Sequence, residues 1–259
     1  MRRNLIITPI GNGNVIDTWF DRPEDRDFDL FAIDFRPGPR EAPRYADYFV
    51  QRAGFKFELL DFVARKHAAE LRRYERIWCP DDDIALDTAS INAMFRLLAQ
   101  YRLQLAQPAI GGGDVSFQSL RPVEGAVLRY APFVEVMCPL FTRESFFRVA
   151  DTFGASRSTW GLDFVWPLRF QPREIAILDR IRARHTRPLA SGEMYVRFKQ
   201  LGIDPRGESA EVVRRFGGIS QRTIRRMVFG KQRMPTVFEP GFQRGLWRHL
   251  VDRITGRAA

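Results

Sequence analysis

The sequence has few of the residues that hold small domains together by covalent or metal links. It contains two cysteines in 259 residues, and Cys79 and Cys138 lie in separate apolar stretches without the spacing of a zinc motif or a disulfide framework. No apolar run approaches the roughly 20 residues that cross a bilayer. The apolar stretch after Arg2-Arg3 stops at Ile10, short of a signal-peptide core. These absences predict a cytoplasmic protein with reduced thiols.

Hydrophobic residues make up 45% of the chain, which is enough for one sizeable α/β domain and too many for a disordered protein. The formal net charge is +10, and residues 206–259 hold 12 Lys and Arg against 4 Asp and Glu, or +8 of that charge. Such a basic segment suits nucleic acid, anionic lipid or a charged glycan, and charge alone does not choose among them. Because the chain has no aromatic-rich RNA-binding signature and no zinc finger, we expect no nucleic-acid partner.

Strand-like and helix-like patterns alternate over the first hundred residues. Short β-rich apolar runs fall at residues 4–8, 28–35, 75–79 and 103–107, and helical spacing of apolar residues falls at 55–74 and 88–101. Further along, 111–113 indicates a mobile glycine connection, 126–141 a hairpin or mixed-sheet segment, 143–153 a helix and 174–178 a late strand. This alternation predicts an α/β fold with a largely parallel sheet flanked by helices, in which ligands bind at the carboxyl ends of the strands.

A change of pattern near residues 201–208 divides the chain. Gly202, Pro205 and Gly207 interrupt the preceding pattern, and the charge balance becomes basic beyond them. We therefore expect a catalytic domain at residues 1–200 and a basic, mainly helical extension at residues 201–259.

Asp81, Asp82 and Asp83 follow a predicted buried strand and precede a helix. Three adjacent carboxylates repel one another unless a cation lies between them. Mn²⁺ or Mg²⁺ prefers oxygen ligands and is commonly held by one or two carboxylates together with substrate phosphates, which suits Asp81 and Asp83. The alternative is that acidic residues here cap the next helix, as Asp87 is expected to do. The position after a strand of an α/β sheet favours the metal.

Five short segments, in one order along the chain, resemble a known family. They are Lys56-Phe57-Glu58-Leu59-Leu60, Ile77-Trp78-Cys79-Pro80-Asp81-Asp82-Asp83-Ile84, Gln107-Pro108-Ala109, Phe133-Val134-Glu135-Val136-Met137 and Trp160-Gly161-Leu162-Asp163. Together they are similar to the glycosyltransferase-like family of unknown function numbered 707, over residues 4–188. The resemblance implies a GT-A-like fold more securely than it implies a named reaction.

The resemblance to GT-A enzymes also implies roles for the acidic cluster. Asp81 and Asp83 stand in the place of the Asp-x-Asp metal ligands, and Asp82 is assigned to the donor site. Pro80 departs from the family pattern and leaves open which two aspartates ligate. A late histidine supplies a further metal ligand in several GT-A enzymes, and His185 is the histidine that follows a late strand. The alternative for His185 is an ordinary surface or core residue.

Trp160-Gly161-Leu162-Asp163 is similar to the Trp-Gly-x-acid segment of inverting GT-A enzymes. That likeness makes Asp163 the candidate general base, which must lie within hydrogen-bond reach of the attacking hydroxyl, and gives Trp160 an apolar face for an acceptor sugar. Alternatively, Asp163 caps a helix and Trp160 fills the core. Glu135, in a predicted buried strand, is a candidate ligand for an acceptor hydroxyl or else the partner of an arginine.

Three more residues are candidates for the donor site. Thr8 and Asp34 end the first two predicted strands, at positions that approach the nucleoside in this fold, although both are also common turn residues. Lys56 lies near a helix start, where it can neutralise the diphosphate, or it is a solvated lysine.

The basic extension has two amphipathic patterns. Residues 212–228 carry five arginines among apolar residues. A second apolar set falls within one half of a helical wheel: Phe242, Leu246, Trp247, Leu250, Val251 and Ile254. These patterns fit either a helix on the anionic inner face of a membrane, where a lipid-linked glycan would be extended, or a face that packs on the catalytic domain.

Together these features predict a metal-dependent, inverting glycosyltransferase that moves a sugar from a nucleoside-diphosphate donor to a glycan or other hydroxyl acceptor. A role in surface-polysaccharide synthesis is an association only. Nucleotidyl or phosphoryl transfer would also use clustered aspartates and a metal. A non-catalytic glycan- or nucleic-acid-binding protein would use the arginine-rich tail.

Overall fold

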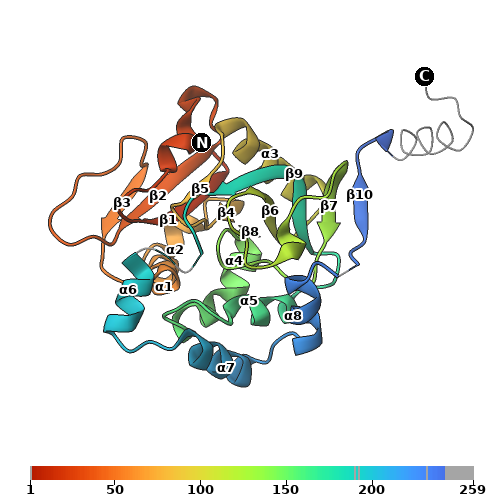
Figure 1. The fold of residues 1–259 in the computed structure, drawn as a ribbon. Helices are drawn as coiled ribbons and strands as arrows, with labels where there is room; N and C mark the ends of the chain where they lie inside the picture. Colours follow the sequence, from red (N-terminus) through yellow and green to blue (C-terminus); the bar gives the residue numbers. More distant parts are fainter. Residues whose placement is uncertain (1, 190, 192, 232, 243–259) are drawn as a thin grey trace, which may run out of the picture.

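The computed structural model describes residues 2–189, 191, 193–231 and 233–242, which form a mixed sheet with helices on both faces (Figure 1). The strand order is β10-β7-β9-β6-β8-β4-β1-β2-β3, with β5 paired to β9. The strands are β1 (Asn4–Ile10), β2 (Phe28–Asp34), β3 (Tyr48–Gln51), β4 (Arg76–Trp78), β5 (Ile84–Ala85), β6 (Leu105–Gly112), β7 (Ala126–Tyr130), β8 (Leu140–Thr142), β9 (Ile175–His185) and β10 (Thr236–Phe238). Within the described residues, β5, β7 and β8 run against the others, so most strands share one direction, as the sequence predicts.

Helices cover both faces of this sheet. They are α1 (Lys56–Lys66), α2 (Ala68–Leu71), α3 (Thr88–Gln100), α4 (Arg143–Val149), α5 (Leu162–Val165), α6 (Glu193–Gln200), α7 (Pro205–Phe216) and α8 (Gln221–Val228). Alternate residues of β1 enter different buried clusters: Ile6 and Ile10 pack with α3, whereas Leu5 and Ile7 pack with α1, α4 and α5. Burial on both faces explains why β1 reads as a continuous apolar run, and it confirms the predicted α/β layers.

Three elements differ from the sequence prediction. The helix expected at residues 55–74 breaks at His67, where φ is −118° and ψ is 26°, and so becomes α1 and α2. Gly111 and Gly112 belong to β6 rather than to a loose connection, because β6 still pairs with β9 there. Of the two alternatives for the segment 126–141, the mixed-sheet segment is correct and the hairpin is not, because β7 and β8 lie at separate places in the sheet.

β9 is longer than predicted and ends at His185. From Asp179 onward its residues alternate between buried and exposed, and the exposed ones are arginines. Asp179 itself is buried because Arg129 of β7 pairs with it, with Nη2 2.9 Å from Oδ1. The sequence prediction ended this strand at residue 178 because the charged residues beyond it interrupt the apolar run.

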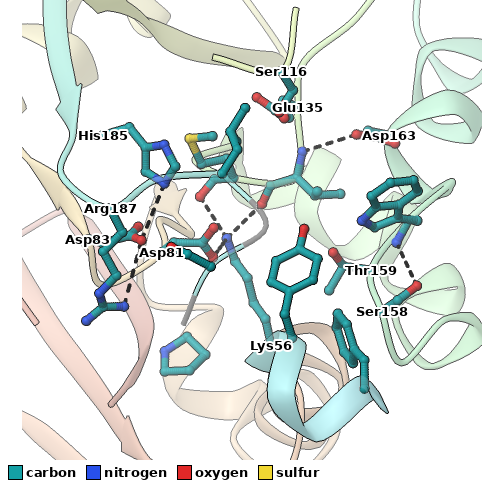
Figure 2. A pocket seen from close by; sticks show the side chains of 18 of the residues that line it. Lys56, Asp81, Asp83, Ser116, Glu135, Ser158, Thr159, Asp163, His185 and Arg187 are labelled. Carbon is teal, nitrogen blue, oxygen red and sulfur yellow. Dashed lines mark hydrogen bonds and ion pairs between the residues drawn. The ribbon is translucent and has the colours of Figure 1, made fainter. Parts of the chain in front are cut away.

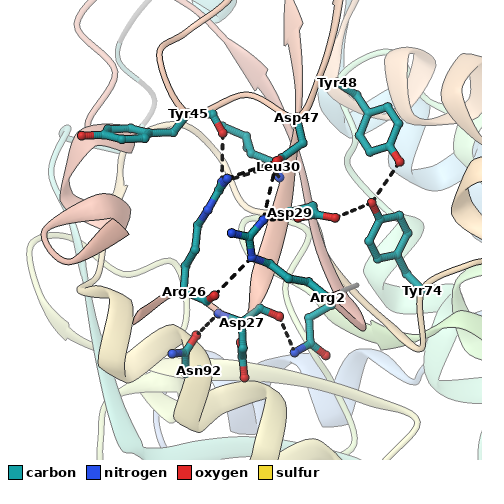
Figure 3. Close-up of polar contacts among 11 residues, drawn as sticks. Arg2, Arg26, Asp27, Asp29, Leu30, Tyr45, Asp47, Tyr48, Tyr74 and Asn92 are labelled. Atoms are coloured by element: carbon teal, nitrogen blue, oxygen red, sulfur yellow. Dashed lines mark hydrogen bonds and ion pairs between the residues drawn. The ribbon is translucent and has the colours of Figure 1, made fainter. Parts of the chain in front are cut away.

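The amino ends of the parallel strands are closed by polar contacts (Figure 3). Arg2 Nη1 lies 2.7 Å from Asp29 Oδ1 of β2, and the Tyr74 hydroxyl donates to Asp29 Oδ2 at 2.8 Å. Arg26 pairs with Asp47, just before β3, at 3.0 Å. These contacts fix β2 and β3 at one end and leave the carboxyl ends of the strands for a ligand.

The described part of the predicted extension joins the sheet through β10 and packs on α5 through α7. β10 pairs with β7 in a region expected to be mainly helical, and Val212 of α7 is buried in the cluster that contains α5. Figure 1 shows α7 beside α5, and contacts between these two helices agree. Phe242 is described, whereas the other residues of the predicted amphipathic tail helix lie outside the described residues: Leu246, Trp247, Leu250, Val251 and Ile254. In the described ranges, no helix is both long and apolar enough to cross a membrane. The division between residues 1–200 and 201–259 stays a prediction.

Candidate active site

A cavity of about 780 Å³ lies where β1, β4 and β9 end. Eight of the ten site residues predicted from the sequence line it: Lys56, Asp81, Asp82, Asp83, Glu135, Trp160, Asp163 and His185. Figure 2 shows the acidic loop with His185 and Arg187 on one side and Asp163 on the other. The sequence predicts that the first side binds the donor and the second the acceptor, and for this prediction we call them the donor end and the acceptor end of the cavity.

The acidic loop leaves β4 between two other segments. The Cys79 N–H donates to Pro139 O at 2.8 Å, and the Asp81 N–H donates to Met137 O at 2.7 Å, so backbone hydrogen bonds continue past the end of the strand. On the other side, the N–H of Thr186 donates to the Asp83 carbonyl at 2.9 Å. The loop is therefore fixed between residues 137–139 and the end of β9.

Asp81 and Asp82 each meet a cationic side chain. Lys56 Nζ lies 2.7 Å from Asp81 Oδ1, and Arg187 Nη1 lies 3.0 Å from Asp82 Oδ1. The Gly11 N–H donates to the second oxygen of Asp82 at 2.6 Å, so protein groups satisfy that carboxylate. Burial raises the pKa of Asp82 to about 6. Burial also raises the pKa of Asp81, and the charge of Lys56 opposes this rise.

Asp83 faces His185 at the end of β9. His185 Nδ1 donates to Asp114 O at 3.3 Å, and Nε2 lies 3.4 Å from Asp83 Oδ2. Burial alone lowers the pKa of His185, but the hydrogen bond and charge of Asp83 outweigh burial and raise this pKa above its ordinary value. Gly113 permits the arrangement: its φ is 73°, and a Cβ there would lie 1.8 Å from the His185 carbonyl oxygen.

The groups around Asp83 fit a divalent cation. Asp83 Oδ1 is buried without a hydrogen-bond partner, which is costly for a carboxylate unless a ligand satisfies it. The Nδ1 of His185 is held by a backbone carbonyl, as is typical of a metal-ligating imidazole. Among the described residues, no three His, Cys, Asp or Glu side chains converge as a complete metal site. Mn²⁺ or Mg²⁺ held here would therefore need further oxygen ligands, which substrate phosphates commonly supply to these ions.

Glu135 and Asp163 are the carboxyl groups of the acceptor end. They are 6% and 5% exposed, and Glu135 Oε2 has no hydrogen-bond partner. Within the described residues, neither forms an ion pair with a basic side chain. The Val136 N–H donates to Asp163 Oδ2 at 3.4 Å. Burial, reinforced by the charge of Glu135, raises the pKa of Asp163 to about 8, and burial raises that of Glu135 to about 7. Such values near neutral pH suit proton transfer.

The wall next to Asp163 carries Trp160, whose side chain is 41% exposed. Glu208 of α7 accepts from the Ser158 N–H at 2.7 Å and so holds the preceding loop. Gly161 immediately precedes α5 with φ at 92°, and a Cβ there would lie 2.9 Å from Ser209 Cα. The close approach of α7 therefore fixes the start of α5. Residues beyond position 200 also line the cavity directly: Arg206, Ser209 and Gln221.

Thr8 and Asp34 lie behind the cavity wall rather than on it. Thr8 is fully buried, and its hydroxyl donates to the Pro80 carbonyl at 3.1 Å, where the acidic loop begins. Asp34 is 1% exposed and pairs with Arg36, whose Nε lies 3.0 Å from Oδ1. Burial raises the pKa of Asp34, but the hydrogen bonds from Arg36 outweigh burial and lower it. Contacts of these two residues with a nucleoside remain predictions.

Several cavity residues were missed by the sequence reasoning. Arg187 lies two residues after His185, and a usable signal existed, because three adjacent aspartates need cations nearby. Ser116 follows β6, and Tyr195 and Phe198 belong to α6. No pattern in the sequence indicated that these three side chains face the cavity.

No protein-family model matches the sequence, and no curated protein matches it either. Among solved structures, GalNAc-T7 with UDP, GalNAc and Mn²⁺ has a TM-score of 0.53 and 11% identity, over 82% of this chain and 48% of that chain. A fragment of S. aureus TarS, residues 1–349 with UDP-GlcNAc, has a TM-score of 0.49 and 12% identity, over 76% of this chain and 61% of that chain. This chain thus spans less than two thirds of either neighbour.

The likeness to GalNAc-T7 shows the fold, which is the GT-A fold of glycosyltransferases, and so confirms the predicted fold class. The resemblance noted in the sequence is supported at this level. It is not supported at the finer level of the family numbered 707.

Proposed function

We propose that the chain is a glycosyltransferase that moves a sugar from a nucleoside-diphosphate donor to a hydroxyl of a glycan acceptor, with inversion. One observation carries this function. In a GT-A fold, a single cavity joins an acidic loop to Asp163, a buried carboxyl with no cationic partner among the described residues. The acidic loop suits a diphosphate with its metal, and Asp163 suits the proton of an attacking hydroxyl.

At the donor end, Asp81 and Asp83 would hold Mn²⁺ or Mg²⁺ together with the diphosphate, with His185 as a further ligand. The bound ion would neutralise charge that develops on the departing diphosphate. Arg187, whose side chain is 31% exposed, adds positive charge at the same end. Asp82 shapes this end through its bonds to Gly11 and Arg187.

At the acceptor end, Asp163 takes the proton of the acceptor hydroxyl. Its raised pKa makes the ionised form a stronger base than an ordinary aspartate. Glu135 accepts a hydrogen bond from another acceptor hydroxyl through its unpaired Oε2, and the exposed ring of Trp160 offers an apolar face to the sugar. Attack from the side opposite the diphosphate inverts the anomeric carbon.

The acceptor is a glycan or a lipid-linked glycan, and α8 lies next to an anionic membrane. Gln221, the first residue of α8, lines the cavity, while Arg222, Arg225 and Arg226 of the same helix are exposed. Clustered arginines favour anionic lipid headgroups. Vesicles that contain phosphatidylglycerol are expected to bind the protein, and binding equal to that of neutral phosphatidylcholine vesicles would contradict this orientation.

The function is tested by calorimetric titration with UDP in the presence of Mn²⁺. UDP is the first probe because GalNAc-T7 was solved with it. We expect binding that is lost with EDTA and in Asp83→Ala. The matched control is Asp87→Ala, a nearby aspartate whose side chain caps α3 by accepting from Ser90 N–H at 2.7 Å, and it should bind UDP normally. Folded protein that binds no nucleoside diphosphate and no nucleotide sugar would indicate a non-catalytic binding protein instead.

A further inference from the structure

The ammonium group of Lys56 is enclosed by acceptors of the protein itself. The side chain is 3% exposed, and Nζ lies 2.7 Å from Val136 O, 2.8 Å from Met137 O and 2.7 Å from Asp81 Oδ1. An ammonium group has three protons to donate, so these three contacts use all of them. We propose that Lys56 is a positioning residue that fixes the acidic loop to residues 133–137 at the acceptor end, and that it does not bind the donor diphosphate.

Lys56 is anchored from behind by α1. It is the first residue of this helix, and Glu58 closes the helix start by accepting from the Phe55 N–H at 3.0 Å. The next side chain, Phe57, is fully buried, as is Leu60. Any movement of the helix start would disturb the core, so the ammonium group is held in place.

Val136 and Met137 are the residues through which Lys56 reaches both ends of the cavity. The Val136 carbonyl accepts from Lys56, while the N–H of the same residue donates to Asp163 Oδ2 at 3.4 Å. The Met137 carbonyl accepts from Lys56 and also from the Asp81 N–H, at 2.7 Å. A continuous chain of contacts therefore runs from Asp81 through Lys56 and Val136 to Asp163 (Figure 2).

This chain of contacts sets the distance between the carboxylates of the donor end and Asp163. The positioning role of Lys56 therefore rests on the proposed function. A misplacement of about 1 Å between reacting groups costs about 10²-fold in rate. A positioning lysine therefore affects turnover more than nucleotide affinity, whereas a ligand of the diphosphate affects affinity directly. Arg187 is the cation that binds the diphosphate in this proposal, because its side chain is 31% exposed compared with 3% for Lys56.

The test compares Lys56→Met with the wild type. Methionine keeps an unbranched apolar chain and removes the three donors. Lys66→Met, at the exposed end of the same helix, is the matched control for the loss of one charge. Calorimetry gives the Kd for UDP with Mn²⁺, and hydrolysis of UDP-GlcNAc and UDP-GalNAc, with water in place of the acceptor, gives kcat.

For Lys56→Met we expect a Kd within about threefold of the wild type and a kcat lower by about 10²-fold, because the base is displaced. Lys66→Met should change neither. A Kd for UDP that rises about tenfold with kcat unchanged would make Lys56 a diphosphate ligand and overturn the positioning role, as would no change in either quantity. If Lys56→Met has no cooperative melting transition, Lys56→Gln, which keeps two donors, takes its place.

Hydrogen exchange separates failure of this role from failure of the proposed function. The amides of Asp81 and Val136 are both hydrogen-bonded along the chain of contacts. Lys56→Met should accelerate their exchange by about tenfold or more, because local opening becomes easier, and Lys66→Met should not. A wild type that binds no nucleotide refutes the glycosyltransferase. Unchanged exchange at these two amides refutes the positioning role.

Discussion

Asp163→Asn replaces the buried carboxyl of the acceptor end by an amide of the same shape. In the folded protein, burial and the charge of Glu135 raise the pKa of Asp163 from 3.8 to about 8. Between these two values the folded state keeps a proton that the unfolded state has released. The free energy of unfolding therefore falls as pH rises from 3.8 to about 8 and is independent of this group above that pH. Asparagine does not ionise, so Asp163→Asn lacks this loss of stability with rising pH.

The size of the effect follows from the pKa. One pKa unit corresponds to about 1.36 kcal/mol. The interval from pH 5 to the folded pKa of about 8 spans about 3 units, so the ionised carboxyl costs at most about 4 kcal/mol more at pH 9 than at pH 5. At about 2–4 °C per kcal/mol for a chain of this size, the melting temperature of Asp163→Asn should gain up to roughly 16 °C on the wild type between these pH values.

Asp163→Asn should lose catalytic activity although it gains stability. Loss of a general base lowers kcat by about 10²–10⁴-fold, and the kcat/KM of the wild type should rise with pH through about 8, as Asp163 ionises. Scanning calorimetry at pH 5, 7 and 9 and hydrolysis of UDP sugars over the same range measure both. Asp17→Asn, at an exposed position, controls for the loss of one charge. A variant that gains no stability over the wild type as pH rises, or that keeps full activity, would refute the role of Asp163.

Three further substitutions test the surroundings of the site. Arg129→Met leaves Asp179 buried without its ion-pair partner, so urea titration should show a loss of about 3–5 kcal/mol in the free energy of unfolding; a loss below about 1 kcal/mol would contradict the structure. Gly113→Ala forces a Cβ against the His185 carbonyl. It should lower the free energy of unfolding by about 1–3 kcal/mol and weaken Mn²⁺-dependent UDP binding. Unchanged UDP binding would show that His185 keeps its place without this glycine. Glu208→Gln removes the charge that holds Ser158, and we expect a lower hydrolysis rate of UDP sugars with the Kd for UDP unchanged; a changed Kd would place this loop at the donor end.

The layers of the fold and the position of the acidic loop were predictable because both follow from the residue pattern within short segments. β1 and β4 read as apolar runs, and the acidic loop follows β4 directly. Asp163 was predicted at a helix start, and it is the second residue of α5. The strands and the acidic loop need only neighbouring residues, whereas Asp163 was found through the likeness of Trp160-Gly161-Leu162-Asp163 to inverting GT-A enzymes. Neither required knowledge of long-range contacts.

The partners of the acidic loop were not predictable in the same way. Lys56 reaches Val136 and Met137 across about 80 positions of the sequence, and Arg187 reaches Asp82 across 105. Such contacts depend on how the strands are ordered in the sheet. The contribution of α7 to the cavity was missed for a related reason: its basic composition indicated an extension, whereas Gly161 lets this helix pack against the start of α5.

The most direct measurement is the product formed from a nucleotide sugar. Purified protein would be incubated with UDP-GlcNAc or UDP-GalNAc and Mn²⁺, and the nucleotides separated by chromatography. A glycosyltransferase with this site releases UDP, and the release should stop with EDTA, in Asp83→Ala and in Asp163→Asn. Folded protein that releases no UDP from a full panel of UDP sugars, or that forms pyrophosphate from UTP and a sugar phosphate, would contradict glycosyl transfer and, in the second case, indicate nucleotidyl transfer.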